Sequence, residues 1–313
     1  MPHALKAASL DDLLRECLTL LQREGDQLTS TRGSSTEIRG ASLELTNPRA
    51  RLSLSSNRGR LFSALGELTW YLAGTSDPKH ILYYIADYGS KVGNYSGGYG
   101  PRLFGAGDQV PRVIRQLKRK PTTRQAVVQL FDRNDLDGDP RDVPCTCSLQ
   151  FFVRNERVDL IVHMRSNDVI YGMPHDIFVF TFLQEIVARA VNCEIGTYTH
   201  LVGSLHIYDS NQQQASAFLE EGVMDNKAMP PMPFGDPMIS VARLVKIEQA
   251  LRLAEPIEYH SELASYWMQL ADVLTGWRAF KENDRASLER IRTRLAGSIY
   301  EIYLSDKQFR LES

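Results

Sequence analysis

The stretch PCTCSLQFFVRNERVDLIVHMRSNDVIYGMPHD, residues 144–176, decides the fold. Its apolar and β-branched residues predict two strands, Cys147–Val153 and Val158–Met164, joined by a tight polar turn at Arg154–Arg157. The apolar run Ile177–Val191 that follows has the length and composition of a buried helix. Two adjacent strands followed by a buried helix indicate a sheet that helices cover.

Further strands are expected on both sides of this stretch. The segments Ile195–Asp209 and Ala126–Phe131 read as strands, and EIRGASLEL at residues 37–45 has the approximate alternation of another. Strands and helices of this kind, without a regular βαβ order, predict an α+β protein with one mixed sheet and packed helices.

The N-terminal half contains one clear helix and two candidate loops. Ser9 is a suitable N-cap, and leucines at helical spacing continue to Gly25. The Ser/Thr/Gly-rich residues 26–36 predict a loop, the apolar run Leu61–Leu72 ends near Gly74, and the glycine-rich residues 87–107 predict a long irregular loop. Long ordered loops are usually functional.

The remaining segments are mostly helical. A basic helix is expected at Val110–Lys120, and an acidic turn at Asp132–Asp142. From about residue 239 the pattern is helical, and breaks at Pro256 and at Lys281–Arg285 divide it into three helices. The expected organisation is a catalytic domain at residues 1–238 with a helical C-terminal extension at residues 239–313.

Composition excludes several classes of function. Of 313 residues, 36 are Lys or Arg and 38 are Asp or Glu, so a net charge of -2 argues against nucleic acid as a partner. No apolar run reaches the ~20 residues of a membrane span, and residues 1–25 lack a signal-peptide layout, so we expect a cytoplasmic protein without a membrane partner. The four scattered cysteines predict neither a disulfide framework nor a metal site.

Cys145 is the first candidate for chemistry. It follows Pro144 at the start of a strand and just after a charged turn, where a thiolate nucleophile could be exposed. The alternative is an inert structural thiol, which is the commoner fate of a cysteine. The polar residues that follow in order favour the nucleophile: Gln150, Arg165-Ser166-x-Asp168, Gly172-x-Pro174-x-Asp176 and His206-x-Tyr208.

Together with Pro144-Cys145, this series resembles the thymidylate synthase family, whose signature runs P-C-H-x-x-x-Q-F, R-S-x-D-x-x-x-G-x-P-x-N and H-x-Y. The match is dense over residues 144–209 and looser over residues 28–131. The resemblance implies a thymidylate-synthase-like mixed sheet with packed helices and a pyrimidine nucleoside monophosphate as substrate. It also implies 5,10-methylenetetrahydrofolate as cofactor and Cys145 as the nucleophile.

A nucleotide phosphate requires cationic and hydroxyl groups. Arg165 offers a charged fork and Ser166 a hydroxyl, and Arg32 in the Ser/Thr-rich loop could add a second cation. The alternative for each arginine is a surface ion pair. The resemblance supports the phosphate role, with a shift of register at Arg32.

The resemblance also implies a homodimer with shared sites. In the family, an arginine from a P-D-S-R-R stretch contacts the phosphate bound by the partner subunit. Here the stretch reads Pro121-Thr122-Thr123-Arg124-Gln125, so Arg124 carries over and the second arginine is replaced by Gln125. Gln150 is likewise implied to contact the nucleotide.

Other family positions carry over residue by residue. Glu67 matches a glutamate that orders water and moves protons, and because it interrupts an apolar run, burial and a raised pKa are expected. The alternative is a carboxylate on a helix surface. Tyr99 matches a tyrosine near the base, and Asp168 matches the aspartate that binds the pterin ring. His206 and Tyr208 are implied to bond the sugar, whereas a core histidine is the alternative for His206.

Asp176 is the most informative departure, because the family has Asn there. An amide supplies one donor and one acceptor, which match O4 and N3–H of uracil. Cytosine inverts both groups, so a protonated carboxyl that accepts from the 4-amino group and donates to N3 fits it. An Asn facing cytosine could leave a polar atom unpaired, at a cost of ~1–3 kcal/mol. Asp176 therefore predicts a cytidylate substrate and a general acid toward N3.

Other departures point away from a synthase. Thr146 replaces a His, Ser204 replaces an Asp, and the tryptophans of the family's I-W-D-E-W loop have become Ile85 and Tyr88. The last residues, 307–313, lack the synthase's short apolar closing tail. With these substitutions the sequence resembles those of the phage dCMP hydroxymethylases and of the CMP hydroxymethylases of nucleoside-antibiotic pathways such as mildiomycin.

The expected activity is cytidylate 5-hydroxymethylation. Cys145 attacks C6, C5 receives the one-carbon unit, and water ordered by Glu67 completes a 5-hydroxymethyl group while tetrahydrofolate leaves unoxidised. The alternatives are a thymidylate synthase, a uridylate hydroxymethylase and a nucleotide-binding paralogue without catalysis. The sequence leaves ribose and deoxyribose equally open.

Overall fold

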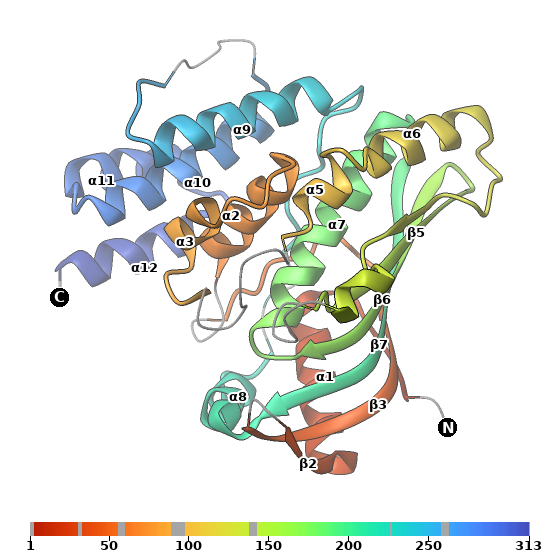
Figure 1. Ribbon diagram of the computed structural model, residues 1–313. Helices are drawn as coiled ribbons and strands as arrows, with labels where there is room; N and C mark the ends of the chain where they lie inside the picture. Colours follow the sequence, from red (N-terminus) through yellow and green to blue (C-terminus); the bar gives the residue numbers. More distant parts are fainter. Residues whose placement is uncertain are drawn as a thin grey trace.

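One seven-stranded mixed sheet organises the protein (Figure 1). The computed structural model describes residues 3–30, 33–55, 60–88, 98–137, 143–223, 225, 227–257 and 263–312. Strands β1/β3 and β6/β7 pair in parallel, and the other neighbours are antiparallel, which confirms the α+β class. The order across the sheet is β1 (His3–Ala7), β3 (Gly33–Leu45), β7 (Glu194–Tyr208), β6 (Arg157–Asp168), β5 (Thr146–Arg154) and β4 (Val127–Gln129), with β2 (Asp26–Ser30) paired to β3.

The hairpin β5–β6 forms where the sequence predicts it. Its turn residues Asn155 and Glu156 have φ values of 48° and 56°, and Arg154 pairs with Arg157. Two consecutive residues with positive φ match the right-handed twist of the flanking strands. The hairpin places Cys145 and Arg165 beside each other at its open end, where the Arg165 N–H donates to the Cys145 carbonyl at 2.8 Å.

Helix α7 (Gly172–Ala190) forms the centre of the core beside the sheet (Figure 1). It is apolar on nearly every side, and a helix of that kind is stable when it is buried. Helix α1 (Leu10–Glu24) packs on β1 and β3, and the Ser9 hydroxyl accepts from the Asp12 N–H at 3.2 Å, as the N-cap prediction requires.

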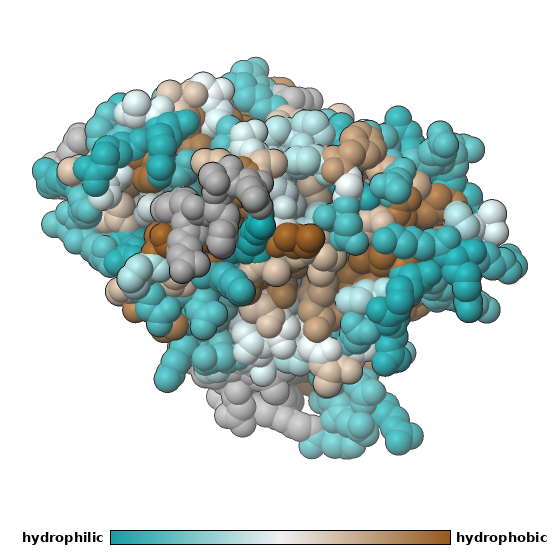
Figure 2. All heavy atoms as spheres, turned by 90° about the horizontal axis from the view of Figure 1, so that it is seen from above, coloured by the Kyte–Doolittle hydropathy of each residue, from teal (hydrophilic) through white to brown (hydrophobic). Residues whose placement is uncertain are grey.

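Shorter helices surround this core. They are α2 (Leu61–Leu72), α3 (Pro78–Tyr84), α5 (Gly100–Leu103), α6 (Gln109–Arg119), α8 (Gln212–Glu220) and the 3₁₀ turns Arg133–Asp137 and Asp209–Asn211. None of the helices in the described ranges is long and apolar enough to cross a membrane. The face seen from above is mainly hydrophilic, with smaller hydrophobic patches between the polar side chains (Figure 2).

The C-terminal extension packs onto α2. It consists of α9 (Met238–Arg252), α10 (Ser265–Lys281), α11 (Arg285–Arg294) and α12 (Glu301–Glu312). The prediction of three helices was wrong, because Gly297, with φ 74°, lies in a further break between α11 and α12. The Tyr303 hydroxyl of α12 donates to the Ser53 carbonyl at 2.6 Å, so the extension is joined directly to the N-terminal part.

Three other expectations need correction. Residues 26–36 contain the β2–β3 hairpin rather than a loop, because their Ser and Thr residues pair across the ladder, with Gln27 bonded to Thr36 at 2.9 Å. The 87–107 segment contains helix α5, and its residues 89–97 lie outside the described residues. The strand expected at 126–131 is shortened to Val127–Gln129, and a 3₁₀ turn opens the acidic segment.

A buried ion pair connects the N-terminal half to α7 and gives a stability prediction. Arg51 and Glu185 are both fully buried and bonded to each other, and Glu185 also accepts from the Met232 N–H at 3.0 Å. Glu185→Ala is expected to lower the free energy of unfolding by about 3–5 kcal/mol, because it leaves the arginine charge buried and unpaired. Urea denaturation measures the loss.

The exposed pair Arg39–Asp26 is the control. Its side chains are 76% and 75% exposed, and Asp26→Ala is expected to cost less than about 1 kcal/mol. Equal losses in the two variants would contradict the assignment of the Arg51–Glu185 pair as a structural contact.

Candidate active site

Cys145 lies half-buried at the start of β5, next to the Arg165 guanidinium of β6. Arg165 donates to the Val143 carbonyl at 2.8 Å, to the Pro144 carbonyl at 2.9 Å and to the Cys145 Sγ at 3.6 Å. A guanidinium beside a partly accessible sulfur favours the thiolate, which is the nucleophilic form. Arg165 therefore holds the segment before β5 and lies within contact distance of the thiol at the same time.

Tyr99 contacts the backbone next to Cys145. Its hydroxyl accepts from the Thr146 N–H at 3.1 Å, one residue after Cys145. Burial raises the pKa of Tyr99, and the nearby charges of Cys145 and Asp176 raise it further. Tyr99 thus stays protonated between the candidate nucleophile and the candidate base-binding carboxyl.

Glu67 is half-buried on α2, and Tyr71 donates to its Oε1 at 2.8 Å. Partial burial raises the pKa of Glu67 to about 7, in the direction expected from the sequence. The Tyr71 ring packs on Tyr99, with centroids 5.2 Å apart. Glu67 is thereby linked, through contacts of Tyr71 and Tyr99, to the backbone next to Cys145.

The raised pKa of Glu67 gives a prediction about pH and stability. The folded protein holds this proton up to about pH 7, whereas the unfolded chain loses it near its ordinary pKa of 4.5, so this group makes folding less favourable as pH rises between the two values. Relative to wild type, Glu67→Gln is expected to gain about 2 kcal/mol of stability between about pH 5.5 and about pH 8. Urea denaturation at both pH values measures the gain, and a pH-independent difference would refute the raised pKa.

Asp176 lies near the start of α7, and the Asn167 side-chain N–H donates to its Oδ2 at 2.7 Å. Burial raises the pKa of Asp176 well above its ordinary value, and the charge of Glu67 raises it further, while the Asn167 bond works in the opposite direction. This half-buried environment favours the neutral carboxyl over the carboxylate. It then offers one hydrogen-bond donor and one acceptor.

The adjacent ends of β6 and β7 hold the next group of predicted residues. Asp168 pairs with His206 in the ladder, and the His206 ring meets Tyr208 edge-on with centroids 4.9 Å apart. Ser166 pairs with Ser204 two residues earlier. Asp168 Oδ1 also accepts from the Ile170 N–H at 2.7 Å, so this aspartate shapes the turn that leads into α7.

Two predicted nucleotide contacts lie elsewhere. Gln150 donates to the Arg124 carbonyl at 2.8 Å, and Arg124 itself is exposed. Five residues of extended strand separate Gln150 from Cys145 by about 17 Å, so Gln150 and Arg124 form a separate pair at the β4 side of the sheet. Arg32 lies outside the described residues.

A family model for thymidylate synthase matches residues 11–244 of the chain. The chain belongs to the thymidylate synthase family. The family model ends midway along α9, so most of the C-terminal extension lies beyond it. Members of this family transfer a one-carbon unit from methylenetetrahydrofolate to a pyrimidine nucleotide, in agreement with the resemblance of the motifs.

Two phage proteins are among the similar curated proteins. The deoxyuridylate hydroxymethyltransferase of Bacillus phage SP01 is 30% identical over 219 residues, which cover 63% of this chain and 56% of that protein. The deoxyuridylate hydroxymethyltransferase of Delftia phage PhiW-14 is 29% identical over 205 residues, which cover 60% of this chain and 57% of that protein. The matches thus span little more than half of each relative.

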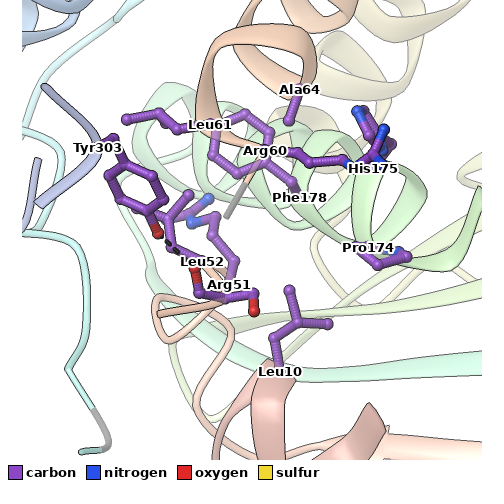
Figure 3. Close-up of a pocket in the computed structure, with 11 residues that line it drawn as sticks. Leu10, Arg51, Leu52, Arg60, Leu61, Ala64, Pro174, His175, Phe178 and Tyr303 are labelled. Atoms are coloured by element: carbon purple, nitrogen blue, oxygen red, sulfur yellow. Dashed lines mark hydrogen bonds between the residues drawn. The ribbon is translucent and has the colours of Figure 1, made fainter. Parts of the chain in front are cut away.

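A small cleft is lined by residues of several elements, among them Ala64 of α2, His175 of α7 and Tyr303 of α12 (Figure 3). Arg60 and His175 line it, and Ser63 bonds His175 at 2.8 Å. The Arg60 guanidinium also lies over the Tyr171 ring, 4.5 Å from its centroid. The cleft adjoins Asp176 through its neighbour His175 but is not lined by Cys145 or by Asp176 itself.

The motif comparison did not identify all residues of the candidate site. Tyr71 lies four residues after Glu67, a spacing that places two side chains on one helix face, so helical periodicity could have found it. Asn167 occupies a variable position of the R-S-x-D motif, and no sequence signal indicated its bond to Asp176. Among the described residues, no group of three or more His, Cys, Asp or Glu side chains is arranged to hold a metal ion.

Proposed function

We propose that the protein is a cytidylate 5-hydroxymethylase. It would transfer a one-carbon unit from 5,10-methylenetetrahydrofolate to C5 of CMP or dCMP, with addition of water, to give 5-hydroxymethyl-(d)CMP and tetrahydrofolate. The observation that carries this proposal is the Asp176 carboxyl near the start of α7, which accepts from the Asn167 amide and whose negative form is disfavoured by burial and by Glu67. The position of Tyr99 supports the proposal, because both Asp176 and Cys145 are close enough to raise the pKa of this tyrosine.

Base selection follows from the protons on Asp176. A neutral carboxyl accepts from the 4-amino group of cytosine and donates to N3, so both polar atoms of the base are paired. An ionised carboxylate could not donate to N3, and would leave two acceptors facing each other. The raised pKa of Asp176 therefore supports cytosine recognition.

Cys145 is the proposed nucleophile. Its thiolate, favoured by Arg165, forms a bond to C6 of the base, and the C5–C6 π electrons move toward C5 and N3. Asp176 would supply a proton to N3 as that negative charge develops. C5 thereby becomes the carbon that accepts a one-carbon electrophile, and it then loses its own proton. When the product forms, the Cys145–C6 bond breaks and the proton on N3 returns to Asp176.

The residues next to this centre fit a folate. Asp168 offers a carboxylate to pterin N–H donors, Tyr171 offers a ring for stacking, and Arg60 offers a cation to the glutamate carboxylate. When bound, methylenetetrahydrofolate supplies a one-carbon unit that the nucleotide accepts at C5. We propose that Asp168, Tyr171 and Arg60 hold it.

Glu67 is the proposed base for water. With a pKa of about 7, it can take a proton from water and return it within one cycle near neutral pH. Tyr88, which replaces a family tryptophan, packs edge-on against Trp70 with centroids 5.8 Å apart. A smaller ring at this place, and Ile85 nearby, favour access of water over the dry site that hydride transfer needs.

The nucleotide phosphate is proposed to meet Arg165, Ser166 and Arg32, and the sugar to meet His206 and Tyr208. Arg124, exposed beside β4, is proposed to reach the site of a partner subunit in a homodimer, with Gln150 fixing its backbone. This proposal explains why Gln150, which bonds the Arg124 carbonyl, lies about 17 Å from Cys145 along β5.

The second candidate is a uridylate hydroxymethylase. The names of the two phage relatives favour it, since both are deoxyuridylate hydroxymethyltransferases. Asp176 is the residue that separates the two candidates, because uracil is matched by an amide at this position.

The fate of the one-carbon unit tests the reaction class. The enzyme, a cytosine nucleotide and methylenetetrahydrofolate are mixed in ¹⁸O-water, while the near-ultraviolet absorbance of dihydrofolate is followed. We expect a 5-hydroxymethyl product that carries one solvent oxygen, without a rise in absorbance. A methylated product with stoichiometric dihydrofolate would overturn the hydroxymethylase assignment in favour of a synthase.

A further inference from the structure

A continuous line of hydrogen bonds runs from Asp176 into the interior. Asn167 donates to Asp176 Oδ2 at 2.7 Å, His200 Nε2 lies 2.8 Å from Asn167 Oδ1, and the Tyr198 hydroxyl lies 2.7 Å from His200 Nδ1. Asn167, His200 and Tyr198 are buried, the last two completely. These three residues come from β6 and β7, whose curvature is visible in Figure 1. We call the four residues the Asp176 relay.

The direction of each bond follows from the chemistry of the groups. Burial lowers the pKa of His200 to about 3, so its ring is neutral and carries one N–H. The amide N–H of Asn167 faces Asp176, which leaves its carbonyl oxygen facing His200. That oxygen can only accept, so His200 donates from Nε2 and accepts at Nδ1 from the Tyr198 hydroxyl. Every donor in the relay thus points toward Asp176.

We propose that Asn167, His200 and Tyr198 are positioning residues that fix which oxygen of Asp176 carries the proton. The Asn167 N–H makes Oδ2 the accepting oxygen, so the proton of the neutral carboxyl resides on Oδ1. Asp176 then presents one acceptor and one donor in a set order. This inference rests on the proposed cytidylate activity, because a fixed order is what the N3 and 4-amino groups of cytosine require.

The opposite polarity would have the opposite effect. If His200 carried its proton on Nδ1, its Nε2 would accept from the Asn167 amide, and the amide oxygen would face Asp176. The Asp176 carboxyl would then donate its proton to the Asn167 amide oxygen. Only an acceptor oxygen of Asp176 would remain to face N3 of cytosine, which is itself an acceptor. The relay therefore excludes the state in which Asp176 faces N3 of cytosine with an acceptor. Its hydrogen bonds also strengthen one another, because they lie in a buried environment.

The tautomer of His200 tests the relay directly. Two-bond ¹H–¹⁵N spectra of the ¹⁵N-histidine-labelled protein distinguish the Nε2–H ring, the Nδ1–H ring and the imidazolium, and His200→Phe assigns the signal. We expect the neutral Nε2–H form from about pH 6 to about pH 8, and a mixture of tautomers in Tyr198→Phe. An Nδ1–H ring or an imidazolium in the wild type would overturn the inference.

Base preference tests what the relay does. In Asn167→Leu and in the milder Tyr198→Phe, we expect the ratio of kcat/KM for CMP to that for UMP to fall, by about tenfold in Asn167→Leu. Gln184→Leu is the matched control, because Gln184 is buried on α7 and bonds the Val158 and Thr197 carbonyls of the same two strands, away from Asp176. Its loss is expected to lower stability and to leave the ratio unchanged.

The outcomes separate this inference from the proposed function. If the wild type prefers cytosine and the relay variants keep its ratio, as Gln184→Leu does, the relay does not order the proton and the inference fails alone. If the wild type prefers uracil, the cytidylate proposal fails and the inference falls with it. A fall in the ratio confined to the relay variants supports both.

Discussion

Replacing Cys145 by alanine is expected to reduce turnover by at least about 10³-fold while nucleotide binding persists. The bond to C6 cannot form without the sulfur. Arg165 keeps its position, because it is held by the Val143 and Pro144 carbonyls rather than by the thiol alone. Release of tritium from C5 of labelled nucleotide measures the chemistry, and calorimetric titration with the nucleotide measures binding.

Cys147→Ala is the matched control for this variant. Cys147 is also half-buried, but burial raises the pKa of its thiol, and its backbone carbonyl accepts from the Leu130 and Phe131 N–H groups irrespective of the side chain. We expect C5 exchange within a few-fold of wild type. Retained C5 exchange in Cys145→Ala, or loss of C5 exchange in Cys147→Ala alone, would show that Cys145 is not the nucleophile.

Asp176→Asn is expected to move the preference from cytosine toward uracil nucleotides. The amide donates to O4 and accepts from N3–H of uracil, whereas it leaves a polar atom of cytosine unpaired. Because each mismatch costs ~1–3 kcal/mol, the ratio of kcat/KM for CMP and UMP should change by about 100-fold or more. Steady-state kinetics with CMP, dCMP, UMP and dUMP measure the shift for either sugar.

Asp272→Asn controls for a general effect of exchanging a buried carboxyl. Asp272 lies on α10, bonds Arg294 at 2.5 Å, and also has a pKa raised by burial, but it lies in the C-terminal extension. Its exchange should leave the base preference unchanged. If Asp176→Asn slows both bases equally, Asp176 is not the selector of the base.

Much of the fold could be predicted from local sequence patterns, and the errors of the prediction have a common cause. The hairpin β5–β6, helix α7 and the capped helix α1 were predicted, since alternation, apolar content and capping are local signals. The β2–β3 hairpin was missed because polar Ser and Thr residues resemble a loop until a partner strand satisfies their backbone. The break at Gly297 was missed because one glycine between two polar helices is a weak signal.

The site was predictable where a residue's own neighbours in sequence reveal its environment. Glu67 interrupts an apolar run, and its burial and raised pKa follow from that pattern. The relay partners of Asp176 were not predictable, since Asn167 and His200 meet only after β6 and β7 curve across α7. Local patterns carry no information on contacts between side chains 33 residues apart.

A competition between bases distinguishes a cytidylate from a uridylate hydroxymethylase. The wild-type enzyme is given equal amounts of CMP and UMP, and in a parallel reaction dCMP and dUMP, with limiting methylenetetrahydrofolate, and the products are identified by mass spectrometry. We expect the 5-hydroxymethyl group on the cytosine nucleotide of at least one pair, with the uracil nucleotide largely unreacted. Preferential hydroxymethylation of the uracil nucleotide in both pairs would contradict it.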